Sequence, residues 1–266
     1  RMLSFGNFSE GTVSVIGGLL AAISLRTPLY IEAVITVLAI PIAWSLVEPQ
    51  RHIQKAARGN MRAIADIVRF ALHGNSEVKW LILYSSVVGA STLSMVWFIQ
   101  PYLKLAGLPL VLFGIAWATL QYAVGFFSLS AHSIERKVGK RTVVLSLVFL
   151  SVAAYLLLGV FNSLWAAVFI LIFYFVRGIA NPVFNGYINA LISSDKRATV
   201  LSVRQMMIRF IFAIVGPFLG WMNDTLSLSA AMFSAALIFL VLGIVSLFFV
   251  HRHGILNVSV PVSEQA

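Results

Sequence analysis

LSAAMFSAALIFLVLGIVSLFFV, at residues 228–250, contains no charged side chain. A helix that crosses the hydrocarbon core of a bilayer, about 30 Å thick, needs roughly 20 such apolar residues. The whole chain of 266 residues is 60% hydrophobic and only 11% charged, which is far outside the usual composition of water-soluble domains. The sequence therefore predicts an all-α protein, a polytopic transmembrane helical bundle.

Seven more apolar runs precede this one, so we expect about eight spans. Each run is bounded by charges, Pro or Asn, as expected for helices that end at the membrane surface. The runs cover residues 8–25, 29–47, 78–103, 107–131, 142–161, 165–192 and 199–222. A long polar stretch at 48–77 separates the first two spans from the last six.

This distribution predicts four parts. They are the last two helices of an N-terminal half at 1–47, a central linker at 48–77, a six-helix C-terminal half at 78–250 and a tail at 251–266. Two plus six helices are natural for the end of two six-helix repeats, which are a known construction of transporters. We therefore expect about four more helices before Arg1.

Lysine and arginine gather in one set of loops. This set includes the linker, residues 136–141, residues 196–197 and Arg252, whereas the opposite loops hold little more than Arg26 and Lys104. Because Lys and Arg concentrate on the cytoplasmic side of membrane proteins, we place the linker and the C-terminus in the cytoplasm and the protein in the cell inner (plasma) membrane. This bias accounts for the formal net charge of +10 without nucleic acid as a partner.

Metal and disulfide chemistry find no support in the composition. The chain has no cysteine, and its five histidines all fall in the predicted cytoplasmic loops or tail: His52, His73, His132, His251 and His253. They form no ligand pattern. We therefore expect no metal and no cofactor.

Apolar residues recur in the linker at three- or four-residue spacing, with basic residues around the rest of the helix. They are Ile53, Ala57, Met61, Ile64, Val68 and Leu72. This pattern predicts an amphipathic helix on the membrane surface, against anionic headgroups. The alternative is a partly ordered tether whose charges only set the topology.

Two segments resemble the major facilitator superfamily. The run AHSIERKVGKR at 131–141 is similar to the signature loop that follows the second helix of each half in that family. The run RGIANP at 177–182, with DKRATVLS at 195–202, looks like the family's tenth helix, loop and eleventh helix. The resemblance implies a 12-helix fold of which this chain holds two plus six helices, and transport by alternating access.

The signature loop also departs from the family pattern at two points. Ala131 replaces the usual Gly, and an extra residue separates Arg136 from Gly139. In the family this loop is a charged latch that helps to hold the cytoplasmic side closed, so the resemblance assigns a gating role to Glu135, Arg136 and Gly139. The alternative is positive charge that only sets the topology.

Arg177 lies near the middle of its predicted span. Asn181, Asn185 and Asn189 follow it at steps of four residues, on a slowly drifting face of the same helix. Charges inside a bilayer are expensive and need a partner or a function. The resemblance implies that this helix lines the central cavity, which makes Arg177, Asn181 and Asn185 candidate substrate-binding residues. The alternative is that they only cross-link helices.

Four other residues complete the predicted site. Trp97 and Gln100 could line the cavity, with ordinary helix packing as the alternative. Arg209 lies about as deep as Arg177, and two deep guanidiniums favour an anionic or carboxylate-bearing substrate. Arg204, by contrast, is within reach of the cytoplasmic headgroups and is expected to snorkel towards them.

Glu32 is the carboxylate that we identify inside an apolar run. A low dielectric favours the protonated form of a carboxylate, which makes Glu32 a candidate for proton coupling. The alternative is a structural role or exposure at the interface, because the resemblance places this helix at the periphery of its half.

These patterns predict a secondary active transporter of small solutes, proton-coupled, monomeric and embedded in the lipid bilayer. The alternative is a membrane-embedded enzyme or a channel. An enzyme would need a catalytic cluster and a channel a filter-like repeat, and neither pattern is visible in the sequence. We therefore expect no enzymatic activity.

Overall fold

The computed structural model describes residues 2–24, 26–46, 75–194 and 196–254. The predicted amphipathic helix of the linker lies outside these residues. The described residues form eight α-helices and two short 3-10 helices, without a strand, which confirms the all-α prediction. The α-helices are α1 (Met2–Ile23), α2 (Thr27–Ser45), α4 (Ser76–Leu105), α5 (Phe113–Val138), α6 (Lys140–Val160), α7 (Ile170–Leu191), α8 (Arg197–Thr225) and α9 (Leu228–Arg252).

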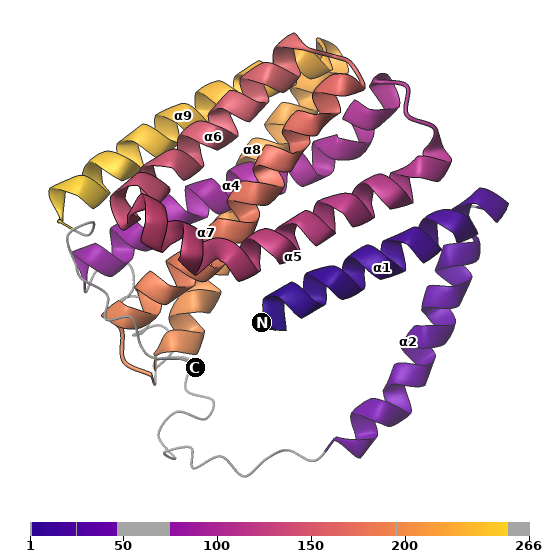
Figure 1. Ribbon diagram of the computed structural model, residues 1–266, viewed down its shortest axis with the longest axis horizontal. Coiled ribbons are helices and arrows are strands. Elements are labelled where there is room, and N and C mark those ends of the chain that lie inside the picture. The colour runs from indigo at the N-terminus through magenta and orange to yellow at the C-terminus, as the bar shows by residue number, and fades with distance from the viewer. Residues whose placement is uncertain (1, 25, 47–74, 195, 255–266) are drawn as a thin grey trace.

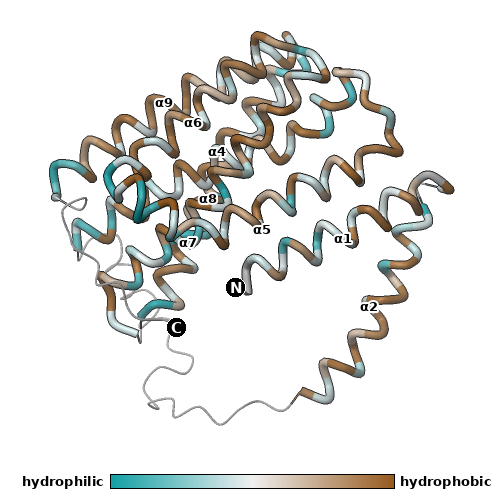
Figure 2. Tube along the Cα trace, in the orientation of Figure 1, coloured by the Kyte–Doolittle hydropathy of each residue, from teal (hydrophilic) through white to brown (hydrophobic). Residues whose placement is uncertain are grey.

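Seven of these helices are long and apolar enough to cross a membrane. The exception is α1, whose middle carries Asn7, Ser9, Glu10, Thr12 and Ser14. Figure 2 shows hydrophobic residues along most of the helices, with hydrophilic ones collected towards their ends. Many large apolar side chains are exposed on the outer surface, as expected where lipid is the solvent.

The bundle has one strongly basic end. Here α4, α6 and α8 begin and α5, α7 and α9 end, so their connections meet on the same side. We call this side the basic end because it carries Arg136, Lys137, Lys140, Arg141, Lys196, Arg197 and Arg252.

The helices α4 and α6 are joined by tyrosine hydroxyls that donate to backbone carbonyls. Tyr84 of α4 donates to the carbonyl of Val144, and Tyr155 of α6 donates to the carbonyl of Ser91 over 2.7 Å. Tyr102, near the other end of α4, donates to the carbonyl of Phe161 over 2.5 Å. Because hydrocarbon offers no partner to a buried hydroxyl, these bonds satisfy the tyrosines and fix the two helices together.

Glycine allows α1 to lie directly against α5 (Figure 1). A Cβ atom added to Gly114 of α5 would lie 2.6 Å from the carbonyl oxygen of Ser14 and 2.9 Å from the Cα of Gly18. Such close backbone approach is typical of helix contacts in membranes. In contrast, α2 has no buried side chain and diverges from the bundle in Figure 1.

A second glycine brings α7 against α5. A Cβ atom added to Gly178 would lie 2.8 Å from the Cβ of Phe127 and 3.1 Å from the carbonyl oxygen of Val124. Gly178 follows Arg177 directly, so this contact fixes the position of the Arg177 backbone beside α5. The helices α1 and α7 therefore both pack against α5.

Candidate functional site

The structure places a guanidinium, that of Arg204, inside the bundle. The side chain is 0% exposed, and its Nε donates to Ser85 Oγ over 3.0 Å. One terminal nitrogen donates to Asn185 Oδ1 over 2.8 Å and the other to Asn181 Oδ1 over 3.4 Å. Arg204 therefore links α8 to both α4 and α7, and we call these four residues the arginine network.

The expectation that Arg204 snorkels to the headgroups is wrong. The position of Arg204 along α8 would allow its side chain to reach the headgroups, since Arg204 lies about 10 Å from the start of the helix. However, Arg204 shares a helix face with Val200 and Ile208, both buried, so this face of α8 points into the bundle. The polar oxygens of α4 and α7 then replace the headgroups as its partners.

Neutral groups surround the guanidinium of Arg204. Its hydrogen-bond partners are two amides and a hydroxyl, and the ring of Phe184 lies 5.9 Å away. In the part of the chain that the structure describes, no carboxylate lies within ion-pair distance of it. The guanidinium of the arginine network is therefore not paired with a carboxylate among the described residues.

A second polar group forms where α1, α5 and α7 meet. Trp117 of α5 donates from its indole nitrogen to the Glu10 carboxylate of α1 over 3.3 Å. The hydroxyl of Tyr174, on α7, interacts electrostatically with both Glu10 and Arg177. We call these four residues the Glu10 cluster, and it contains charges of both signs.

The Glu10 cluster includes a residue that the sequence analysis missed. Glu32 was identified as the carboxylate inside a span, whereas Glu10 lies inside α1. Glu10 falls within the predicted first span at 8–25 but was not among the charged residues singled out there; the helix itself begins at Met2. The run of polar residues before Gly17 was the available signal that α1 faces other helices on one side.

Some buried polar atoms next to these helices have no hydrogen-bond partner among the described residues. They are the hydroxyl of Tyr174, the Oε1 of Gln121 on α5 and the Oδ1 of Asn189 on α7. Tyr174 and Gln121 are each only 1% exposed. Because an unpaired buried polar group is costly, these atoms are available to a bound ligand or to water.

The predicted stripe on α7 is divided between the two groups. Asn181 and Asn185 share a face, as their spacing predicted, but their amide oxygens accept hydrogen bonds from Arg204. Arg177 is half-buried one turn earlier and belongs to the Glu10 cluster. Asn181 and Asn185 therefore lie on one face of α7, and Arg204 of α8 binds both of them.

The other predicted substrate-binding residues lie on exposed surfaces. Trp97 is 66% exposed, and its ring stacks on that of Phe212 at 6.0 Å, which joins α4 to α8. Gln100 and Arg209 are exposed, and their side chains form no hydrogen bond with the described residues. Glu32 is also exposed, on α2.

The connection between α5 and α6 is tied to the end of α7. Glu135 accepts a hydrogen bond from the Tyr187 hydroxyl, and its other oxygen lies 3.5 Å from His132 Nδ1. The ammonium of Lys140 lies 4.3 Å above the Tyr187 ring. Gly139, between the two helices, has a φ of +89°, a backbone conformation that favours glycine. Arg136 points to the exposed surface.

Metal binding finds no support in this arrangement. Within residues 2–24, 26–46, 75–194 and 196–254, no group of three or more His, Cys, Asp or Glu side chains could hold an ion. Among the described residues, the polar groups of the interior include guanidinium, amide and hydroxyl groups, which suit the reversible binding of a polar solute.

Comparison with known proteins gives one family match. The family model described as Major Facilitator Superfamily matches residues 1–217, from α1 to the middle of α8. No curated protein matches the chain.

Proposed function

Because the chain belongs to the Major Facilitator Superfamily, we propose that it is a secondary active, proton-coupled transporter of small solutes that works by alternating access. The family and the membrane-spanning helices make it a multi-pass membrane protein of a transporter family. The observation that carries the finer proposal is the Glu10 cluster. Glu10 and Arg177 each lie within electrostatic range of the buried Tyr174 hydroxyl, and charged groups on the helices of a membrane protein are kept for a function.

The substrate that we propose carries an anionic group, and Arg177 binds it. Arg177 is half-buried and forms no hydrogen bond with the described residues, so its planar fork is free to bind a carboxylate with two hydrogen bonds. The unpartnered hydroxyl of Tyr174 and amide of Gln121 are further polar groups next to α5 and α7. The positive charge of the arginine network favours an anion in the same interior.

The orientation that we propose follows from the basic end. Loops rich in Lys and Arg remain on the cytoplasmic side, so the basic end, the linker and the C-terminus face the cytoplasm of a cell inner membrane. The protein acts as a monomer, and the division at 48–77 separates an N-terminal half from the six-helix half.

Uptake into vesicles tests this function. The full-length protein, with any helices that precede Arg1, reconstituted in proteoliposomes with an imposed pH gradient, is expected to accumulate a labelled small carboxylate above its external concentration, and an uncoupler should abolish the accumulation. An enzyme would change the solute chemically, and a channel would only equilibrate it. Either of these outcomes would contradict the proposal.

Two carboxylates are candidates for carrying the coupled proton. Both side chains are exposed, but Glu10 also accepts a hydrogen bond from Trp117 and lies within electrostatic range of Tyr174 on α7, the helix that carries Arg177. We therefore expect Glu10→Gln to abolish uphill accumulation while exchange of labelled for unlabelled solute continues. Glu32→Gln is the matched control, measured in the same vesicles. If Glu32→Gln lost uphill uptake and Glu10→Gln kept it, Glu32 would be the residue that carries the coupled proton.

The α5–α6 connection is expected to control the balance between inward-open and outward-open states. Tyr187→Phe and Glu135→Gln each weaken the charged hydrogen bond between this connection and α7, which should change the transport rate about tenfold with little change in substrate affinity. Arg136→Gln tests the other charge of the latch, and the exposed Lys137→Gln serves as the control. If these variants reach normal levels in the membrane and their transport rates are unchanged, the loop only sets the topology.

A further inference from the structure

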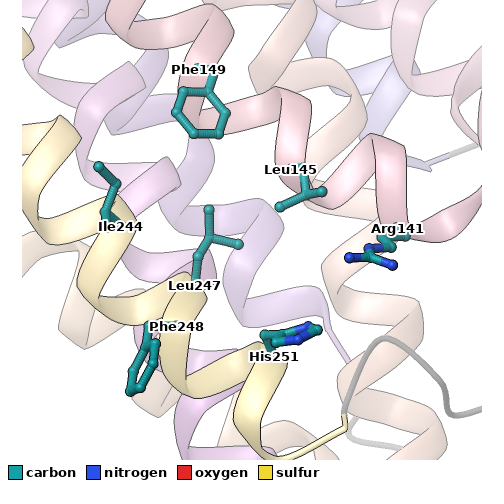
Figure 3. A pocket seen from close by; sticks show the side chains of 7 residues that line it. All are labelled: Arg141, Leu145, Phe149, Ile244, Leu247, Phe248 and His251. Atoms are coloured by element: carbon teal, nitrogen blue, oxygen red, sulfur yellow. The ribbon is translucent and has the colours of Figure 1, made fainter.

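A groove of about 310 Å³ runs along the outside of the bundle between α6 and α9. Its α6 wall consists of Arg141, Leu145 and Phe149, which are four residues apart and therefore share one helix face. Figure 3 shows the guanidinium of Arg141 and the ring of Phe149 at opposite ends of this wall. One wall of the groove is thus cationic at one end and apolar along the rest.

The α9 wall repeats this arrangement. Ile244, Leu247 and Phe248 form its apolar part, and His251 lies one turn further along the helix. Leu247 is buried, whereas Ile244 and Phe248 are about half exposed on the outer surface. Figure 3 places the imidazole of His251 at the same end of the groove as Arg141.

Close packing makes the groove a fixed feature of the bundle. A Cβ atom added to Gly243 would lie 2.6 Å from a γ-methyl group of Val148, so the backbones of α9 and α6 approach each other directly beside the groove. The groove therefore does not depend on the position of a loop.

The depth of the groove matches one leaflet. Arg141 is the second residue of α6 and His251 is the last but one of α9, so both lie at the basic end. From Arg141 to Phe149 the helix rises about 12 Å, close to the roughly 15 Å of hydrocarbon in half a bilayer. The cationic end therefore lies at the level of the phosphates and the apolar part beside the acyl chains.

We propose that this groove is a binding site for an anionic phospholipid of the phosphatidylglycerol type. Arg141 and His251 bind the phosphate, and one acyl chain lies along Leu145, Phe149 and Ile244. A guanidinium can donate two parallel hydrogen bonds to a phosphate, and an imidazole can donate one whether or not it is protonated. The site is independent of the transported substrate and of the direction of transport.

Charge selects the anionic lipid over a zwitterionic one. None of the described residues that line the groove is a carboxylate, so the ammonium group of a zwitterionic lipid would find no partner among them. Among the described residues, the side chains of Arg141 and His251 form no hydrogen bond or ion pair that a phosphate would have to displace. Lys140 and Arg252, at the same end of the bundle, add to the positive potential.

Native mass spectrometry of the purified full chain, titrated with phosphatidylglycerol or phosphatidylcholine, tests the proposal. The unmodified protein is expected to retain phosphatidylglycerol at least about tenfold better. Arg141→Gln with His251→Gln should remove this preference, because both phosphate contacts are lost. Arg252→Gln removes one charge from the same end of α9 but not from the groove, and should change the preference less than about twofold.

A second variant tests the acyl-chain part of the site. Ile244→Trp fills the groove at a half-exposed position and keeps both cations, so phosphatidylglycerol retention should fall at least about fivefold. Equal retention of the two lipids by the unmodified protein would overturn the proposal. So would an effect of Arg252→Gln as large as that of the double variant, or full retention in Ile244→Trp.

Discussion

Arg204→Lys is expected to lower the free energy of unfolding by about 2–4 kcal/mol. The ammonium keeps the buried charge but cannot reach Ser85, Asn181 and Asn185 together, so that at least one buried acceptor loses its partner. The melting temperature of the purified protein should therefore fall by roughly 5–15 °C. Thermal unfolding in detergent measures the change directly.

Arg209→Lys is the matched control for this experiment. It is the same substitution in the same helix, at an exposed position without a hydrogen-bond partner among the described residues, and should shift the melting temperature by no more than about 2 °C. If Arg204→Lys were as mild as Arg209→Lys, the hydrogen bonds of the arginine network would contribute little to stability.

Arg177→Lys is expected to weaken binding of a carboxylate substrate by roughly ten- to a hundredfold. Lysine keeps the charge but loses the planar fork that binds a carboxylate with two hydrogen bonds, and one charged hydrogen bond is worth about 1.5–3 kcal/mol. Arg177→Ala should be at least as damaging. The dissociation constant of the labelled carboxylate that the vesicles accumulate, measured on purified full-chain variants, gives the answer.

Arg197→Lys, at the exposed start of α8, controls for the substitution itself and should leave the dissociation constant within about twofold. Melting temperatures of the variants separate a loss of binding from a loss of folding. Unchanged affinity in both Arg177 variants would make this residue a cross-link between helices rather than part of a binding site.

The presence of a spanning helix such as α9 could be predicted from the sequence, because the length of its apolar run is enough to indicate it. Residues 228–250 were expected to form a span and do so within α9. Helix ends were harder to place, since a polar helix that packs against other helices can begin well before its apolar run. The helix α1 begins at Met2 rather than at residue 8, and its Glu10 was not among the charged residues singled out from the sequence.

Contacts across the bundle could be predicted only in part. The spacing of Asn181 and Asn185 correctly placed both amides on one face of α7, because this relation is local. Their partner, Arg204, lies on another helix, and depth along α8 does not reveal which way its side chain points. The buried positions of Val200 and Ile208, four residues on either side, supply the missing direction.

The tyrosine hydroxyls between α4 and α6 also limit how this protein can deform. Sliding one helix past the other would break the bonds of Tyr84, Tyr155 and Tyr102 at once, at sites spread along the whole length of α4. The two helices should therefore move as one rigid body. Side chains also interlock between α1 and α5, where the Tyr122 ring lies against Gly11 and the Phe8 ring against Gly125, so a rocking motion is expected to carry this pair of helices as a unit as well.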